Sequence, residues 1–257
     1  MKYPSTYDVE RVFLRSFVAR EIADPLASFD GATPCEQVVA VMTEDEIPVA
    51  AIRLRGRPVG YILRDELRDG LCGVYAHPFE NALVLPDSIP LVELIHALQE
   101  TSWAFIRILG EVAGIITRQD LQDPPVRMWL FGLVTTLEMH FHKLIQAHYP
   151  DQGWEHYLSP RRVEAARVLL EERRRRGQSP SLLDCLQLSD KGQIIARDAE
   201  LRREAGFASR NRADEIMKRL EALRNNLAHS QDIIDSDWEV IVLIAARVEE
   251  VLKFWKE

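Results

Sequence analysis

The sequence has few of the features that mark a membrane or secreted protein. No uninterrupted apolar run reaches the ~18–20 residues that a membrane-spanning helix needs, and the longest apolar pieces are short, such as "MWLFGLV". The N-terminal "MKYPSTYDVERVF" has no apolar signal core and no cleavage-like site. The three cysteines lie far apart without a CxxC spacing, which argues against a disulfide framework and a structural zinc. We therefore expect a cytoplasmic protein with reduced thiols and no membrane partner.

Several common catalytic signatures are also missing. "SFDGAT" has a glycine but no P-loop lysine, and no Gly-x-Ser-x-Gly sequence occurs. The histidine-rich "LEMHFHKLIQAH" is the one stretch that could indicate a metal. On a helix, however, His140 and His142 point about 160° apart, and only Glu138 and His142 share a face. An ion pair or a dimer contact is favoured over a metal site there, so we predict no metal cofactor.

Positive charge is scarce in the first half of the chain. Residues 1–124 hold 11 Lys and Arg against 19 Asp and Glu, whereas residues 125–257 hold 21 of each. A front half this acidic is a poor general binder of nucleic acid. In the second half, "SPRRVEAARVLLEERRRRG" carries seven arginines against three glutamates. This segment is either a solvated helix end that faces the helix dipole or a surface that meets phosphates, and both interpretations stay open.

An internal repeat is present at an offset of 54 residues. When "PVAAIRLRGRPVGYILRDEL" (48–67) is placed over "SWAFIRILGEVAGIITRQDL" (102–121), eight of twenty positions are identical. Each copy is typical of a strand, a glycine turn, a second strand and a helix start, after a preceding helix. For the first of those helices we predict a capping box with Thr33 as N-cap, Pro34 at the first helical position and Glu36. The second begins at Pro90 and has an apolar face of Leu91, Leu94, Ile95 and Leu98.

The repeated unit resembles a tandem pair of CBS domains, a nucleotide-sensing module, over residues 20–122. Its most specific piece is "GIITRQDL" (114–121), which fits the family's Gly-x-x-Thr/Ser-x-x-Asp pattern, beginning at Gly114. The resemblance implies that Thr117 faces a phosphate and that Asp120 holds the ribose hydroxyls of an adenine nucleotide such as AMP or ATP. This is reasonable chemistry, since a carboxylate accepts two hydrogen bonds from a diol. The first copy departs from the pattern, with Leu63 and Glu66 at the matching positions, so we expect one dominant site. A ligand-free pair that serves as a dimerisation platform is the alternative.

The second half has a helical pattern without strand-like alternation. Asp123-Pro124-Pro125 forms a rigid boundary. We then predict a helix with a broad apolar stripe up to Pro150, a helix over 161–176, two shorter helices, a long helix from Ser209, and a last helix capped by Ser236 or Asp237. The sequence therefore predicts an α+β protein, with residues 1–122 as the tandem module and residues 123–257 as an all-α bundle of four or five helices.

The long helix ends in "RNNLAH" (224–229), which pairs an arginine with a histidine. On an ideal helix Asn225 and His229 lie about 40° apart, but Arg224 and His229 lie about 140° apart. Arg224 and His229 can therefore converge only if the helix ends or tightens, or if a second chain completes the pair. The simpler interpretation is that Asn226 and His229 cap the helix end.

This motif, near the end of the penultimate helix, resembles the Arg-x4-6-His motif of the HEPN superfamily, over residues 125–257. The resemblance implies a homodimeric, metal-independent endoribonuclease with Arg224, His229 and Asn225 as catalytic residues and RNA as substrate. Chemically, a histidine can transfer the 2′-hydroxyl proton and an arginine can hold the scissile phosphate.

We predict a nucleotide-regulated endoribonuclease, of the kind found as toxins or phage-defence effectors, with an antitoxin-like partner. The alternative is a non-catalytic adenine-nucleotide sensor whose helical domain mediates dimerisation and binds a partner or RNA.

Overall fold

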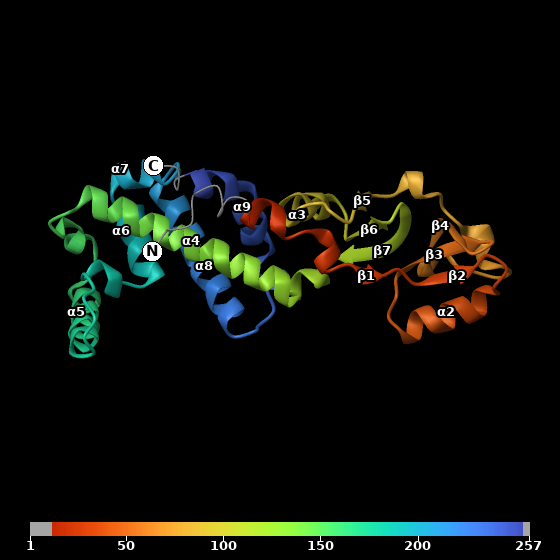
Figure 1. The fold of residues 1–257 in the computed structure, drawn as a ribbon, viewed down its shortest axis with the longest axis horizontal. Coiled ribbons are helices and arrows are strands. Elements are labelled where there is room, and N and C mark those ends of the chain that lie inside the picture. Colours follow the sequence, from red (N-terminus) through yellow and green to blue (C-terminus); the bar gives the residue numbers. More distant parts are fainter. Residues whose placement is uncertain (1–11, 254–257) are drawn as a thin grey trace. The chain divides into compact units, whose positions relative to one another are not determined.

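The computed structural model describes residues 12–253. The chain divides into two compact units. One is Leu14–Val126; the other contains the described residues from Arg127 onward together with Val12 and Phe13. The first unit is mixed α and β and the second is helical, so the α+β class is confirmed (Figure 1).

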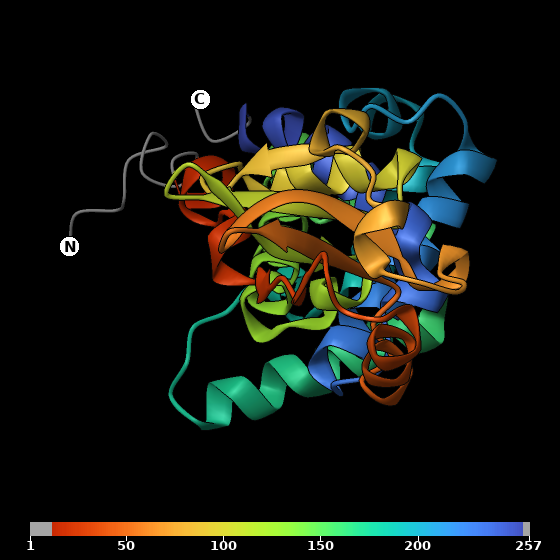
Figure 2. The ribbon, with the colours of Figure 1, turned by 90° about the vertical axis from the view of Figure 1, so that its right-hand side faces the viewer.

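Two copies of one βαββ unit build the first body, and Figure 2 shows their strands face on. Each copy begins with a short strand that precedes its helix and that was not predicted. The first copy consists of β2 (Ser28–Asp30), α2 (Cys35–Glu44), β3 (Val49–Leu54), β4 (Arg57–Leu63) and the one-turn helix η3 (Arg64–Glu66). The second consists of β5 (Val84–Pro86), α3 (Leu91–Glu100), β6 (Trp103–Ile108), β7 (Glu111–Thr117) and η6 (Gln119–Gln122). Before and between them lie η1 (Val12–Ser16), η2 (Ala19–Glu21), β1 (Asp24–Pro25), η4 (Cys72–Tyr75) and η5 (Phe79–Asn81).

The two β-hairpins repeat at the offset of 54 residues in both bounds and register. Val49 pairs with Leu63 and Ile52 with Gly60; in the second copy Trp103 pairs with Thr117 and Ile106 with Gly114. Each hairpin has a bulge after its fourth residue, at Ile52/Arg53 and at Ile106/Arg107. Each turns through two residues with positive φ, of which the second is a glycine, as a tight hairpin turn requires. The repeat seen in the sequence is therefore a repeat of structure.

The core of this unit has two parts. On one face of the first sheet, Ala50, Ile52 and Ile62 pack against Val38 and Met42 of α2. The other face contributes Val49 and Tyr61 to a cluster that contains Phe105 and Val112 of the second sheet. Both faces of each hairpin are thus covered. In the second copy, the predicted apolar face of α3 is confirmed, because its four residues are at most 1% exposed.

One arginine in each repeat holds the end of that repeat's own helix. Arg64 donates to the carbonyl of Met42 at 3.3 Å, and Arg118 donates to the carbonyls of Leu98 and Gln99 at 2.9 and 3.1 Å. The last carbonyls of a helix lack partners within the helix and carry its negative dipole end, so a guanidinium satisfies both needs. This explains why arginine stands at both positions.

The predicted capping box at the start of α2 is wrong. Pro34 is the N-cap residue, and no side chain caps the helix. One backbone N–H of the first turn is satisfied from elsewhere, because Cys35 donates to the carbonyl of Gly70 at 2.8 Å. The linker between the repeats, rather than Thr33 or Glu36, therefore provides a hydrogen-bond acceptor at this helix start.

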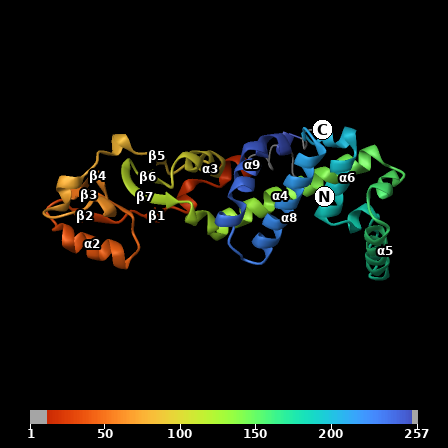
Figure 3. The same cartoon turned by 180° about the vertical axis from the view of Figure 1, so that it is seen from behind.

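The helical unit is built around α4 (Pro124–His148), α6 (Leu188–Arg197), α8 (Arg210–Ala228) and α9 (Ile234–Lys253). Its core includes Trp129, Leu133 and Phe141 of α4, which lie on the apolar face predicted for this helix. At the crossing of α6 and α8, a Cβ on Gly192 would lie 2.4 Å from Met217, so the glycine permits the close approach. The helices are α4 (Pro124–His148), η7 (Gly153–Tyr157), α5 (Pro160–Arg175), η8 (Leu183–Cys185), α6 (Leu188–Arg197), α7 (Ala199–Glu204), α8 (Arg210–Ala228) and α9 (Ile234–Lys253), seen from two sides in Figures 1 and 3.

Two expectations for this unit need correction. Among the described residues it contains six α-helices, as many as the helical segments predicted along the sequence, although the bundle was predicted to have four or five. The predicted cap of the last helix is also wrong: α9 begins at Ile234, where Asp232 accepts from the backbone N–H groups of Ile234 and Asp235. Ser209 does cap α8, accepting from Arg212.

A buried carboxylate organises the turn between α6 and α7. One oxygen of Asp198 accepts from the backbone N–H groups of Glu200 and Leu201, and the other accepts from the hydroxyls of Tyr149 and Tyr157. Burial alone would raise the pKa of Asp198, but these hydrogen bonds stabilise the charged form and lower the pKa from 3.8 to about 2.

The helical unit should therefore lose stability in acid through Asp198. A carboxyl whose pKa is lowered by folding stabilises the protein fully above its unfolded pKa, and this contribution disappears as the pH falls from about 4 through about 2. Asp198→Asn should flatten this part of the pH dependence, measured as thermal unfolding midpoints by circular dichroism. The exposed Asp151→Asn is the control, and an unchanged slope in Asp198→Asn would contradict the assignment.

Gly60 and Gly114 occupy the same position of the two repeats and give a matched pair. A Cβ on Gly60 would lie 2.3 Å from the carbonyl oxygen of His77, which is backbone, whereas a Cβ on Gly114 would meet side-chain atoms of Ile106 and Ile108 at 3.2 and 3.3 Å. Gly60→Ala should cost about 1–3 kcal/mol in chemical denaturation, as overpacking does. Gly114→Ala should cost clearly less, and equal costs would be against this description.

Candidate functional site

The structure brings Thr117 and Asp120 together at the end of β7. The backbone N–H and the hydroxyl of Thr117 both donate to Oδ2 of Asp120, at 2.5 and 3.0 Å. The hydroxyl oxygen of Thr117 accepts in turn from the N–H of Gln119 at 3.2 Å. Among the described residues nothing hydrogen-bonds the other carboxylate oxygen, Oδ1. Asp120 is thus held in one orientation with one acceptor oxygen left for a ligand.

Asp120 has an unusually acidic neighbourhood. Its half-burial raises its pKa, and the nearby carboxylates of Asp24 and Asp123 raise it further. Burial and Asp24 also raise the pKa of Asp123. A hydroxyl donor such as a ribose diol would stabilise this carboxylate, whereas an anionic group placed directly against it would not.

Gly114, the first residue of the predicted nucleotide motif, is buried within β7. A Cβ there would lie 3.2 to 3.4 Å from Ile106, from Ile108 and from the carbonyl oxygen of Asp24. The glycine therefore allows β1 and β6 to lie close on either side of β7. Its position explains the packing around the motif, and no ligand contact is needed to account for it.

In the first repeat the matching position is closed by the chain itself. Leu63 replaces the threonine, and the carboxylate of Glu66 lies 2.5 Å from Nε2 of His77. His77 belongs to the linker between the repeats, and its backbone exchanges two hydrogen bonds with Tyr61. A neighbouring ring also contacts it, since the centroids of Tyr61 and His77 are 5.3 Å apart. Glu66 is thus engaged before any ligand arrives.

His77 and Asp24 occupy equivalent places in the two repeats. His77 pairs with Tyr61 on β4, and Asp24 pairs with Ile115 on β7, where Ile115 is the repeat partner of Tyr61. In the first repeat the neighbouring segment therefore places the imidazole of His77 beside Glu66. In the second repeat it places a second carboxylate, that of Asp24, near Asp120. Neither residue was predicted as a site residue from the sequence, because neither lies inside the two aligned segments.

Arg224, Asn225 and His229 lie at the exposed end of α8. His229 is the C-cap residue, and its backbone N–H donates to the carbonyl of Asn225 at 3.0 Å. Within the described part of the chain the side chains of these three residues make no hydrogen bond or ion pair. The structure thus presents all three to solvent, and the histidine side chain does not cap the helix.

Other groups fix the end of α8. Asn226 donates to the carboxylate of Asp237 at 2.7 Å, so this asparagine joins α8 to α9. Arg127 of α4 donates to the carbonyls of Asn226 and Gln231 at 2.8 and 2.9 Å. Ser230 has a φ of 54°, and Gln231 donates back to the carbonyl of Asn226, which is the hydrogen-bond pattern of a Schellman cap.

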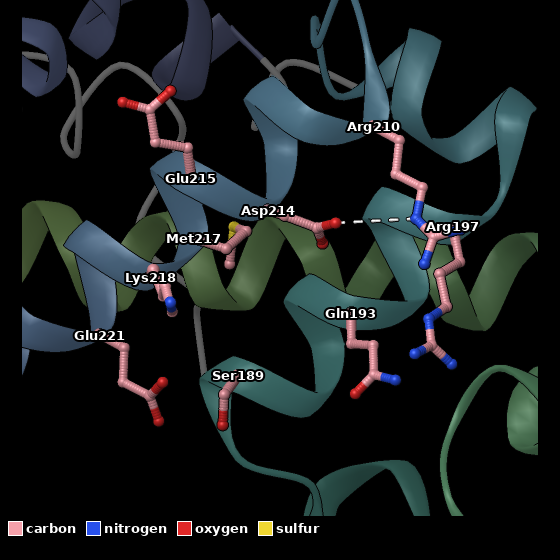
Figure 4. A pocket seen from close by; sticks show the side chains of 9 residues that line it. All are labelled: Ser189, Gln193, Arg197, Arg210, Asp214, Glu215, Met217, Lys218 and Glu221. Carbon is pink, nitrogen blue, oxygen red and sulfur yellow. Dashed lines mark ion pairs between the residues drawn. The ribbon is translucent and has the colours of Figure 1, made fainter.

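A groove of about 490 Å³ separates α6 from α8. Ser189, Gln193 and Arg197 line it from α6 at a spacing of four residues, and Arg210, Lys218 and Glu221 are among those that line it from α8 (Figure 4). Arg210 forms an ion pair with Asp214, at 3.6 Å. Because cations and carboxylates are equally numerous along the groove, its charge selects neither anions nor cations.

Glu138 and His142 of the histidine-rich stretch form ion pairs rather than a common site. Glu138 bonds the buried Lys191 at 2.8 Å, and His142 lies 3.5 Å from Asp184. Among residues 12–253 no group of three or more His, Cys, Asp and Glu is arranged to hold a metal ion. The helices described here include none that is both long and apolar enough to cross a membrane.

No protein-family model and no curated protein matches the chain. Several solved structures of CBS-domain proteins are similar to it, and they cover 41–48% of the chain in its N-terminal part. One is the CBS domain of a bacterial CNNM/CorC family Mg²⁺ transporter in complex with ATP, 16% identical, covering 48% of this chain and 94% of that one with a TM-score of 0.37. Another is CBSX2 in complex with AMP, 16% identical, covering 41% and 93% with a TM-score of 0.36. A third is a haemolysin-like CBS protein of Oenococcus oeni, 10% identical, covering 46% and 96% with a TM-score of 0.35. Similarity at this level does not assign a function to this chain.

Proposed function

We propose that residues 14–126 form a tandem CBS-like module that binds an adenine nucleotide, AMP or ATP, and thereby regulates the helical unit. The observation that carries this is the asymmetry of the two repeats. Asp120 is oriented by Thr117 and keeps one carboxylate oxygen for a ribose, whereas Glu66 is engaged by His77.

The proposal gives Thr117 a positioning role. Its hydroxyl donates to Asp120, so it fixes the carboxylate that accepts from the ribose hydroxyls. The same hydroxyl would have to rotate away from Asp120 before it could donate to a phosphate. The phosphates are better placed away from Asp24, Asp120 and Asp123, because like charges would repel them.

Calorimetric titration of the full chain with AMP and ATP should show about one site per chain. Asp120→Ala should weaken binding by roughly tenfold to a hundredfold, because it removes a charge-assisted hydrogen bond. Glu66→Ala is the matched control in the first repeat and should leave the affinity unchanged. Two equal sites, or an affinity that is unchanged in Asp120→Ala, would show that the wrong repeat has been assigned.

A second candidate function is favoured by the end of α8. Arg224, Asn225 and His229 are exposed, and their side chains form no hydrogen bond or ion pair with the described residues, whereas Asn226 and Arg127 beside them hold the helix end. We propose that these residues form a metal-independent endoribonuclease site. Arg224 would bind the scissile phosphate, His229 would transfer protons, and Asn225 would orient the imidazole or contact the phosphate. A homodimer would complete the site, and an antitoxin-like partner would restrain such an enzyme.

Cleavage of RNA should then persist in EDTA, leave a 2′,3′-cyclic phosphate, and be lost in both Arg224→Ala and His229→Ala. If one site takes its arginine and histidine from two chains, mixing the two inactive variants under subunit exchange should restore activity. Asn226→Ala serves as a control for damage to the helix end. Dependence on added Mg²⁺, or full activity of His229→Ala, would remove this second function and leave nucleotide binding unaffected.

A further inference from the structure

The outward side of α4 carries an apolar stripe, which we define as Met128, Phe131, Thr135 and Met139. The fractions of Met128, Phe131 and Met139 exposed to solvent are 69%, 43% and 46%. The spacing of three, four and four residues puts all four on one face of the helix. The hydroxyl of Thr135 donates to the carbonyl of Phe131 at 2.8 Å, so its polar atom is satisfied within the helix. In Figure 1, α4 lies at the front of the helical unit.

The opposite side of α4 is already packed, because Trp129, Leu130 and Leu133 are at most 2% exposed. Residues 128–137 contain no charged side chain. A helix that is apolar on all sides is normally covered on all sides. The stripe therefore has the composition of a buried helix face while it is open to solvent.

We propose that a second copy of this chain packs on the stripe, with the twofold axis near Phe131. A twofold axis across the helix pairs two α4 helices antiparallel, so that Phe131 meets Phe131 of the partner and Met128 meets the partner's Thr135. The absence of charge over 128–137 matters here, since an isologous contact would otherwise place like charges together. Methionine and phenylalanine side chains also pack well against one another.

The stripe alone is too small for a stable dimer interface, so the interface has to extend onto neighbouring surface. The stripe exposes on the order of 300 Å² of apolar side chain, whereas a stable interface buries about 800 Å² on each partner. The surface next to its N-terminal end is the last turn of α8, because Arg127 binds the carbonyls of Asn226 and Gln231 there. With the axis near Phe131, residue 127 of one chain lies about 12 Å along the helix direction from residue 127 of the other. The two ends of α8 then come close, whereas an axis at Thr135 would separate them by about 24 Å.

This arrangement deepens the second proposed function without depending on it. Arg224 and His229 point in different directions from one helix, and neighbouring α8 ends allow one chain to contribute the arginine and the other the histidine. The interface itself requires only the stripe and the adjoining helix end. Self-association can therefore be tested whether or not the protein cleaves RNA or binds nucleotides.

Sedimentation of the full chain at micromolar concentration should show a dimer. Phe131→Glu should weaken association by roughly a hundredfold or more, because it places two carboxylates in an apolar contact. Val168→Glu is the matched control: Val168 is 59% exposed on α5, outside the stripe, and its substitution should leave the dimer intact. Circular dichroism establishes that both variants are folded. A monomeric wild type, or a dimer that survives Phe131→Glu, overturns the proposal.

Cysteine trapping tests the position of the axis. The native cysteines Cys35, Cys72 and Cys185 are all buried, so they give little background. Phe131→Cys should form a disulfide-linked dimer under mild oxidation, since residues on the axis come within the ~4.4–6.8 Å between Cα atoms that a disulfide allows. Met139→Cys lies on the same stripe but about 24 Å from its copy, and it should stay monomeric on a denaturing gel. The reverse result, or no crosslink at either position, would overturn the placement of the axis.

Discussion

Three arginine guanidiniums lie on the carbonyl groups that end three helices, and the geometry of both candidate sites depends on this interaction. Arg64 and Arg118 hold the ends of α2 and α3, while Arg127 holds the end of α8. A helix end has up to four carbonyls without intrahelical partners, and a planar guanidinium with five donors can satisfy several at once. In the repeats this ties the helix to the strand end that carries Asp120 or Glu66. At α8 it fixes the turn that presents Arg224 and His229.

The two repeats have the same backbone arrangement but different side chains around the carboxylate of Glu66 or Asp120. Their hairpins share bounds, register, bulge and turn, so the backbone around Asp120 and Glu66 is built in the same way. What differs is the side chain that the neighbouring segment brings, Asp24 in one case and His77 in the other. An imidazole beside a carboxylate satisfies it internally, whereas a second carboxylate leaves it in need of a donor. In the proposed function, divergence in the segments that flank the motif, and not in the motif alone, distinguishes the repeat that binds a nucleotide.

The sequence predicted the parts of the fold that depend on local rules. The hairpins followed from glycines at turns and from strand alternation, and Ser209 followed from the preference of helix starts for serine. The short strands β2 and β5 were missed because three residues give no usable period. The cap of α2 was predicted wrongly because a linker carbonyl 35 residues away, that of Gly70, satisfies it. His77 could not have been assigned to Glu66 either, since their contact depends on the path of that linker.

In the candidate site on α8 the role of each residue also could not be predicted from the sequence alone. Sequence alone could not separate the two adjacent asparagines of "RNNLAH", yet they differ in role: Asn226 bonds Asp237 across the turn, and Asn225 is exposed. Adjacent helical residues point about 100° apart, so one can serve the bundle while the other faces outward. Stability requires the inward residue. The side chains of Arg224, Asn225 and His229 form no hydrogen bond or ion pair with other residues that the structure describes, so the fold itself does not account for these residue types on the exposed helix end. These three residues lie beside the uncharged apolar face of α4. Burying that face against a second chain would remove the surrounding water. The electrostatic interactions of a guanidinium and an imidazole with a phosphate would then be stronger.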